Sequence, residues 1–338
     1  MIEVKNLTKK YGNFCAVNNL SFTIEKGKIY GFLGPNGAGK STTMNIVTGC
    51  LSATGGRVLV DGVDIFENPL AAKKKIGYLP ELPPLYTEMT PAEYLTFVAE
   101  AKGVDYEEAP RQIREVMELT QITHVSDRLI RNLSKGYRQR VGIAQALLGH
   151  PEIIILDEPT VGLDPKQIIE IRELIRSLGK TKTVIVSSHI LAEISAVCDH
   201  VMILSRGCLV ANDSLANLEE SAMADATLHL TVKGNADAVT ALLSEIDGVR
   251  GVKLENSDGK ICHVSLDTDP SCDPRDRIFY TLADKKMSLV EMYVKHASLE
   301  DIFLRLTSDE EVSEECPTIE RHEHSVPNET ECKGGDVK

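Results

Sequence analysis

The sequence has 338 residues, enough for about two domains and for a hydrophobic core that needs neither disulfides nor a structural metal. Hydrophobic residues make up 42% and charged residues 26%, as in ordinary soluble proteins, and no apolar run approaches the roughly 18 residues of a membrane-spanning helix. The formal net charge of -13 argues against a general nucleic-acid binder, although the segment from Asp309 to Lys338 alone holds ten acidic and three basic residues.

The sequence up to about residue 220 predicts an α/β domain. Apolar and β-rich runs, many of them ended by glycine or proline, predict strands at 2–7, 20–33, 57–65 (a hairpin), 76–79, 153–156 and 183–186. Helices are expected around 40–48 and 165–178. Helical apolar spacing from Pro91 to Gly149 indicates an inserted helical subdomain at about 85–150. Because strands alternate with helices, we assign residues 1–220 to one domain.

A second, smaller α+β domain is expected at residues 225–307. The patterns there follow one another as strand, helix, strand, strand, helix, strand and a final helix. This order is that of ferredoxin-like domains. A ligand-sensing role and a dimerising or stabilising role both stay open for it. Residues 308–338 are acidic and almost without aromatic residues, which predicts a disordered tail.

The segment from Gly34 to Ser41 fits the phosphate-binding pattern G-x-x-x-x-G-K-[ST] between a predicted strand and a predicted helix. Glycines let successive backbone N–H groups converge on a polyphosphate, and the helix N-terminus adds a favourable dipole. In this pattern the lysine reaches the β- and γ-phosphates and the serine hydroxyl binds Mg²⁺. The expected nucleotide-binding residues here are Gly34, Pro35, Asn36, Gly37, Ala38, Gly39, Lys40, Ser41 and Thr42.

Two carboxylates follow a second apolar strand. Asp157 and Glu158 end the run that begins at Ile153. Asp157 is suited to hold Mg²⁺ through water, and Glu158 is suited to polarise the attacking water as a general base. An isolated Asp-Glu pair at a strand end is most often a solvated turn. Beside the phosphate-binding loop it indicates a nucleoside triphosphatase, and the absence of an Asn-Lys-x-Asp motif disfavours GTP.

A third segment, from Leu133 to Arg140, lies just before a predicted helix. Ser134 can cap that helix, and Gly136 keeps the backbone accessible. This second helix N-terminus also suits a phosphate, although a plain N-cap is the alternative when the segment is taken alone.

With these three segments, residues 1–220 resemble the ATP-binding subunits of ABC transporters. Ser134–Arg140 is similar to that family's signature motif, which binds the γ-phosphate of ATP held by the opposite subunit. The resemblance also implies an adenine-stacking aromatic with a neighbouring valine, an aspartate in the loop that crosses the dimer interface, and a switch histidine at the γ-phosphate, namely Tyr11, Val17, Asp164 and His189.

Three positions depart from the usual family pattern. Lys135 and Tyr137 replace a glycine and the glutamine of the signature. Glu81 stands where the family usually has a glutamine that touches Mg²⁺ and signals to the membrane subunit, so Glu81 is expected at the metal. These variants, together with the stretch Ser298–Phe303, resemble the ABC-2-type exporter branch, which includes gliding-motility and multidrug-like ATPases.

The resemblance implies an ATPase that forms a homodimer around two ATP molecules and powers a separate polytopic membrane permease for export. Each nucleotide site is expected to combine residues of both chains, with catalytic Lys40, Glu158 and His189 of one facing Ser134, Gly136 and Asp164 of the other. ATP and Mg²⁺ are the expected cofactors, and no nucleic-acid partner is expected. The groove beside Glu81 and the helical insert is the expected surface for the permease.

Two other functions are alternatives to this one. A soluble ABC-type ATPase that acts on ribosomes or DNA usually has two nucleotide domains or long coiled-coil insertions, and this chain has neither. A regulatory module with a degenerate site is disfavoured by intact Lys40, Glu158 and His189. The N-terminal sequence has no secretory signal and the eight cysteines are scattered, so we expect a cytoplasmic protein held at the inner face of the cell membrane by its permease.

Overall fold

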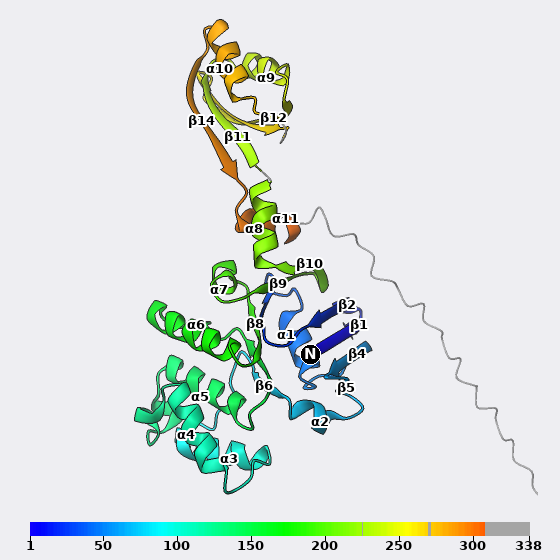
Figure 1. Cartoon of the computed structure of the whole chain (residues 1–338), viewed down its shortest axis with the longest axis vertical. Helices are drawn as coiled ribbons and strands as arrows, with labels where there is room; N and C mark the ends of the chain where they lie inside the picture. The colour runs from blue at the N-terminus through cyan, green and yellow to red at the C-terminus, as the bar shows by residue number, and fades with distance from the viewer. Residues whose placement is uncertain (225, 270–271, 308–338) are drawn as a thin grey trace, which may run out of the picture.

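The computed structural model describes residues 1–224, 226–269 and 272–307 and shows a large cassette with a smaller domain beyond it (Figure 1). A six-stranded sheet in the order β10-β9-β3-β8-β7-β6 forms the centre of the cassette. Its strands are β3 (Ile29–Leu33), β6 (Ile76–Leu79), β7 (Ile153–Asp157), β8 (Thr183–Ser188), β9 (His200–Ser205) and β10 (Cys208–Ser214). All except β10 run parallel, so their carboxyl ends meet at one edge.

An antiparallel sheet in the order β2-β1-β4-β5 covers one face of the central sheet. The strands are β1 (Ile2–Tyr11), β2 (Phe14–Ile24), β4 (Gly55–Val60) and β5 (Val63–Asp64), and the two helices beside them are α1 (Lys40–Val47) and α2 (Pro69–Lys73). Asp61 and Gly62 turn β4 into β5 with φ of 47° and 78°, the left-handed geometry that favours an Asp-Gly pair. A buried cluster that includes Val4, Phe32 and Met44 fills the space between the sheets.

Helices cover the other face of the central sheet and form the insert between β6 and β7. They are α3 (Pro91–Ala101), α4 (Ala109–Leu119), the 3-10 turns Thr123–Val125 and Ile130–Asn132, α5 (Lys135–Leu147), α6 (Pro165–Gly179) and α7 (Leu191–Ser195). Thr90 and Glu93 form a capping box at the start of α3, where Pro91 occupies the first turn. One buried cluster joins these helices to the sheet, so the insert and the sheet share a core.

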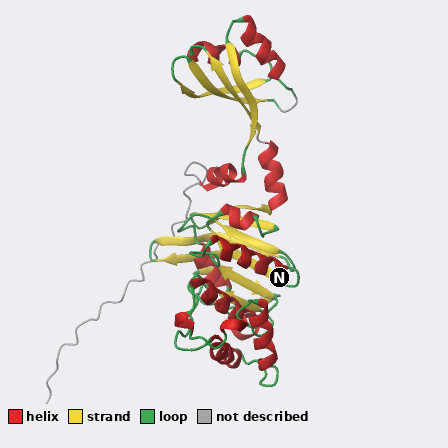
Figure 2. Cartoon of the chain, turned by 90° about the vertical axis from the view of Figure 1, so that its left-hand side faces the viewer, coloured by secondary structure: helices red, strands yellow, loops and turns green. Residues whose placement is uncertain are grey.

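The smaller domain has the ferredoxin-like order of strands, β14-β11-β13-β12, with every neighbouring pair antiparallel. Its elements are β11 (Ala226–Lys233), α9 (Ala236–Ser244), β12 (Val249–Ser257), β13 (Ile261–Thr268), α10 (Arg275–Asp284) and β14 (Ser288–His296). The two helices pack on one face of the sheet (Figure 2). Helix α8 (Leu215–Ala224) leads out of the cassette to this domain, and α11 (Leu299–Thr307) returns to pack against α7, α8, β9 and β10.

The predicted fold class and the β-α-β-β-α-β order are confirmed. Helix α8 was not predicted; it spans the boundary between the two expected domains. The predicted disordered tail, 308–338, lies outside the described residues. In the part of the chain that the structure describes, no helix is both long and apolar enough to cross a membrane.

Candidate functional site

The predicted phosphate-binding loop joins β3 to α1 at the carboxyl edge of the central sheet. Helix α1 has Gly39 as its N-cap, with φ of 98° and no side-chain cap, so backbone N–H groups of the first turn are left for a ligand. A β-carbon at Gly39 would lie 2.5 Å from the carbonyl oxygen of Ala16. The loop therefore requires glycine there for both its backbone angle and its contact with β2.

Lys40 is buried and folds back over the loop. Its Nζ donates to the carbonyl oxygens of Gly34 at 2.8 Å and Pro35 at 3.3 Å, and it lies 3.6 Å from Oε1 of Glu158. A buried ammonium is costly unless it is paired, so this cation is held between two carbonyls and a carboxylate. A triphosphate that enters the loop can take over the pairing with the ammonium.

The carboxyl ends of β7 and β8 form one hydrogen-bonded unit. The hydroxyl of Ser187 donates to Oδ1 of Asp157 at 2.5 Å and accepts from the backbone N–H of Glu158 at 2.9 Å. The Ser41 hydroxyl at the start of α1 donates to the same Asp157 oxygen at 3.4 Å. The serine and aspartate that were predicted for the metal therefore lie together, although Ser41 and Asp157 are 116 positions apart in the sequence.

Glu158 and His189 also come together. The Nδ1 atom of His189 lies 3.0 Å from Oε2 and 3.2 Å from Oε1 of Glu158. An ionised carboxylate can only accept hydrogen bonds, so Nδ1 carries the proton and, in the neutral ring, Nε2 is the free acceptor. Glu158 has φ of 47°, a left-handed conformation that a side-chain-bearing residue adopts only when its surroundings hold it. Such residues are concentrated at active sites.

A pocket of about 490 Å³ contains most of the predicted residues. Its lining consists of Tyr11, Phe14, Ala16, Asn36, Gly37, Ala38, Gly39, Lys40, Ser41, Thr42, Glu81, Glu158, Val161 and His189. Val17 does not reach it, because neighbouring residues of a strand face opposite sides and Val17 lies in the core between the sheets. The expectation that Val17 contacts the nucleotide is therefore corrected in favour of Ala16 and Phe14.

Ser134, Gly136 and Asp164 lie outside this pocket. Ser134 is exposed and caps α5 by accepting the backbone N–H of Tyr137, and Asp164 is exposed and caps α6 by accepting that of Gln167. Gly136 is buried, and a β-carbon there would lie 2.5 Å from the side chain of Gln167. The structure therefore places the three residues at the start of two helices and not at the nucleotide loop of their own chain.

The groups that were predicted for the metal, the Ser41 hydroxyl and the Asp157 carboxylate, offer oxygen atoms, which are the ligands that Mg²⁺ prefers. Among the described residues no three His, Cys, Asp or Glu side chains converge on a metal-sized point. Glu81, which we expected at the metal, is an exposed residue of the pocket lining and does not converge with Asp157 and Glu158 on such a point. Mg²⁺ commonly uses only one or two protein groups beside phosphates and waters, and Ser41 with Asp157 fits that requirement.

Several residues of the site were missed by the sequence analysis. Ser187 holds the carboxylate of Asp157 and the backbone N–H of Glu158, as described above. Glu193 is buried on α7, and its Oε2 accepts from the hydroxyls of Thr160 at 2.6 Å and Ser188 at 3.0 Å. The available signal was a glutamate inside an otherwise apolar turn of helix, which is too common to interpret without the fold.

Comparison with known proteins gives a consistent result. Residues 17–161 match the family model described as ABC transporter. The linearmycin resistance ATP-binding protein LnrL of Bacillus subtilis (strain 168) is 32% identical over 91% of this chain and 98% of its own length. The bacitracin transport ATP-binding protein BcrA of Bacillus licheniformis is 42% identical over 62% of this chain and 68% of its own.

Solved structures agree. A dimeric, post-hydrolysis form of the ATP-binding cassette MJ0796, bound to ADP and Pi, superposes with a TM-score of 0.58 at 28% identity, covering 64% of this chain and 99% of that one. An ATP-binding subunit of an ABC transporter gives a TM-score of 0.60 at 30% identity, over 65% of this chain and 92% of that one. These matches and the assembled pocket show that the chain belongs to the ABC transporter family, as a subunit that binds and hydrolyses ATP.

Proposed function

We propose that two copies of this chain close head to tail around two ATP molecules, with Mg²⁺, and thereby drive a separate membrane permease. The observation that carries this proposal is the split between the two groups of site residues. Lys40, Glu158 and His189 share one pocket, whereas Ser134 and Asp164 are exposed at helix N-termini outside it. A helix N-terminus favours an anion, so Ser134 of one copy is suited to the γ-phosphate held by the other.

Within the pocket each side chain has a role that its contacts support. Lys40 neutralises the β- and γ-phosphates, and Glu158 takes the proton from the water that attacks the γ-phosphorus as the bond to the β-phosphate oxygen breaks. His189 keeps Glu158 oriented through Nδ1, at 3.0 Å, and leaves Nε2 to accept a hydrogen bond from the attacking water. The exposed ring of Tyr11 is suited to stack on the adenine.

Ser41 and Asp157 are the residues that would hold Mg²⁺. When bound, the ion offsets the negative charge of the phosphates and orients them. The Ser187 hydroxyl fixes the Asp157 carboxylate for this task, and the exposed carboxylate of Glu81 lines the same pocket from the segment after β6.

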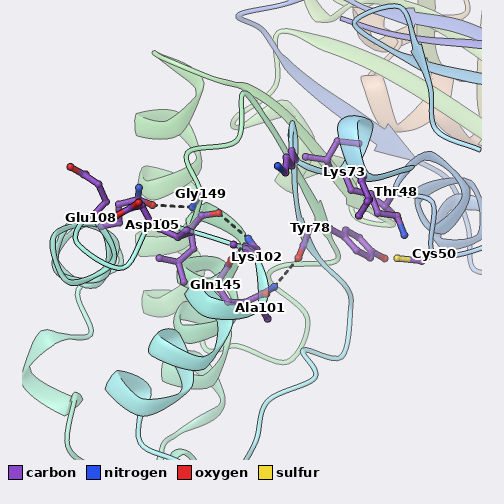
Figure 3. A pocket seen from close by; sticks show the side chains of 17 residues that line it. Thr48, Cys50, Lys73, Tyr78, Ala101, Lys102, Asp105, Glu108, Gln145 and Gly149 are labelled. Carbon is purple, nitrogen blue, oxygen red and sulfur yellow. Dashed lines mark hydrogen bonds between the residues drawn. The ribbon is translucent and has the colours of Figure 1, made fainter. Parts of the chain in front are cut away.

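The sequence led us to expect the permease beside Glu81 and the helical insert, but Glu81 lines the ATP pocket. In this proposal the permease instead docks in a separate pocket of about 600 Å³ between the sheet and the insert (Figure 3). Tyr78 of β6 and Cys50, just after α1, line this pocket from one side, and Lys102 and Gln145 line it from the other. Helix α1 begins at Lys40 in the ATP pocket, and β6 leads to Glu81 there. Two short elements therefore connect the nucleotide to the docking groove, which allows closure on ATP to act on the permease.

We propose that the direction of transport is export, because the chain is 32% and 42% identical to relatives named for linearmycin resistance and bacitracin transport. In this proposal the chain resides in the cytoplasm and reaches the inner face of the membrane through the permease. A non-transport ABC-type ATPase is not favoured, since these relatives are named for resistance and transport.

The test of the shared site is Glu158→Gln. This change keeps the shape of the residue and removes the base, so we expect unchanged ATP binding, a fall in kcat of at least about 10³-fold, and a nucleotide-trapped dimer in size-exclusion chromatography with ATP. Lys40→Ala is the control, because it lacks the charge that binds the triphosphate and should stay monomeric. A Glu158→Gln variant that turns over ATP at the normal rate and remains monomeric contradicts the proposal.

The docking groove has its own test. Leu70 is 77% exposed and lines the groove, so Leu70→Asp should lower co-purification of the chain with its permease and leave the ATPase rate of the isolated chain unchanged. Tyr106→Asp is the matched control, since Tyr106 is 88% exposed and does not line the groove. Equal co-purification of the two variants would place the permease elsewhere.

A further inference from the structure

Helix α7 lies immediately after His189 and is fastened to both catalytic strand ends by one side chain. The buried Oε2 of Glu193 accepts from the Thr160 hydroxyl at 2.6 Å and from the Ser188 hydroxyl at 3.0 Å. Thr160 lies two positions after Glu158, and Ser188 directly precedes His189. The segment that carries the base and the segment that carries the histidine therefore share a single carboxylate oxygen as their common acceptor.

The inner side of α7 rests on the strand that leads to the nucleotide loop. A β-carbon at Gly31 of β3 would lie 2.3 Å from a methyl group of Ile194, so the helix and the strand are in close contact. The Ser188 hydroxyl also accepts from the backbone N–H of Ile190 at 3.1 Å, which fixes the turn between His189 and the helix. The position of α7 therefore sets the position of His189, and little space exists for it to shift inward.

The outer side of α7 is held by a helix that comes from the far end of the chain. Helix α11 returns from the C-terminal domain and contacts α7, β9, β10 and α8 (Figure 1). Phe303 and Leu306 lie on one face of α11 and pack against the buried cluster that contains Ile194 of α7 and Val201 of β9. Leu304, which directly follows Phe303, faces away from this cluster and is 62% exposed.

We propose that Glu193, Phe303 and Leu306 are positioning residues, through which the C-terminal domain holds α7 and thereby sets the geometry of Glu158 and His189. A shift of α7 moves the Glu193 oxygen away from Thr160 and Ser188, and the two catalytic side chains lose their common support. Because Glu158 sits in a left-handed backbone conformation that its surroundings must hold, that support decides its placement. This inference rests on the proposed roles of Glu158 and His189.

Steady-state ATPase measurements on the full chain test the proposal. Glu193→Ala should lower kcat by about tenfold, a part of the roughly 100-fold that a 1 Å misplacement can cost, with KM for ATP unchanged within about twofold. Glu193→Gln retains an oxygen that accepts both hydroxyls and should restore kcat to within about twofold of the normal value. Phe303→Ala should lower kcat by about fivefold, and Leu304→Ala on the opposite face should leave it unchanged.

Hydrogen exchange gives a readout that does not depend on catalysis. Peptides that cover residues 189–196 should exchange faster in Phe303→Ala than in Leu304→Ala, whereas peptides over 40–47 should be unaffected. If Phe303→Ala does not remain folded in a thermal melt, Phe303→Leu and Leu306→Ala replace it and should show the same changes at smaller size.

The outcomes separate the inference from the function that it rests on. Equal kcat and equal exchange over residues 189–196 in Phe303→Ala and Leu304→Ala would overturn the proposed link from α11. A fall in kcat as large for Glu193→Gln as for Glu193→Ala would overturn the role of Glu193 as a hydrogen-bond acceptor. Normal turnover by Glu158→Gln would instead refute the assigned base, whatever happens at α11.

Discussion

The six-stranded sheet of the cassette is covered on both faces, whereas in the described part of the C-terminal domain helices cover one face of the four-stranded sheet (Figure 2). In β7, Ile153 and Ile155 belong to the cluster on one face, and Ile154 and Leu156 belong to the cluster on the other. In β13, Cys262, Val264 and Leu266 are buried, and the residues between them are not. The first strand is therefore apolar throughout, and the second alternates.

The difference extends to function. Parallel strands end at a common edge, and the residues that follow β3, β7 and β8 meet there in the ATP pocket. Antiparallel strands of the C-terminal domain have no such edge, and none of its described side chains lines that pocket. Its contacts with the cassette are made through α8 and α11, which are the contacts that the proposed positioning role requires.

The largest effect is expected at the nucleotide loop. Lys40→Ala removes the cation from the β- and γ-phosphates, so we expect ATP affinity to fall by about 10³-fold, close to 4 kcal/mol. In dilute monomer, Ser134→Ala should leave the affinity for ATP unchanged. It should reduce the dimer-dependent ATPase rate, and loss of the helix cap should lower the free energy of unfolding by about 1 kcal/mol. Equilibrium titration with a fluorescent ATP analogue measures both. Equal losses of affinity would rule out a site shared between chains.

Two leucines allow the sheets to be compared directly. Leu156 of β7 and Leu266 of β13 are both fully buried. Replacing either by alanine should lower the free energy of unfolding of the domain that contains it by about 3 kcal/mol. Leu156 directly precedes Asp157, so Leu156→Ala should also weaken ATP binding. Leu266→Ala should leave ATP affinity intact, with faster hydrogen exchange confined to the C-terminal domain. Weakened ATP binding in Leu266→Ala would mean that the two domains unfold as one unit.

The sequence alone was enough to predict the parts of the molecule that local pattern controls. The loop before Lys40, the carboxylates after β7 and the ferredoxin-like order each follow from short runs of residues, and these predictions agree with the structure. The support provided by Ser187 and Glu193 could not be predicted, because it depends on hydrogen bonds across strand ends that only the fold brings together. Val17 was named from the family resemblance alone, and only the fold shows that its side chain lies in the core between the sheets.

Lys102 offers a test of the helical insert. Its Nζ donates to the carbonyl oxygens of Gln145, Ala146 and Leu148 at the end of α5, and burial lowers its pKa to about 8. Between pH 8 and its ordinary pKa near 10.5, the unfolded chain binds this proton and the folded chain does not, so the free energy of unfolding rises with pH.

The comparison of wild type with Lys102→Met isolates this contribution. The difference in unfolding free energy, wild type minus variant, should grow by up to about 1.4 kcal/mol per pH unit above pH 8 and be flat below it. Urea unfolding at several pH values measures it. A difference that shrinks as the pH rises would show that the helix carbonyls stabilise the charged ammonium more than burial opposes it.

The smallest effect is expected at Glu81, which lines the ATP pocket but is exposed. Its negative charge is the smallest of four causes that raise the pKa of Tyr78, after burial, Asp157 and Cys50. Glu81→Gln removes a negative charge near the proposed metal and should raise the Mg²⁺ concentration for half-maximal ATPase by about two- to fivefold. Asp157→Asn is the matched comparison and should abolish the response to Mg²⁺, because Asp157 accepts a hydrogen bond from Ser41 where we propose that the ion binds. Indistinguishable Mg²⁺ dependence of Glu81→Gln and wild type would place Glu81 outside the metal site, since an exposed carboxylate that contacts neither the ion nor its waters is screened by solvent.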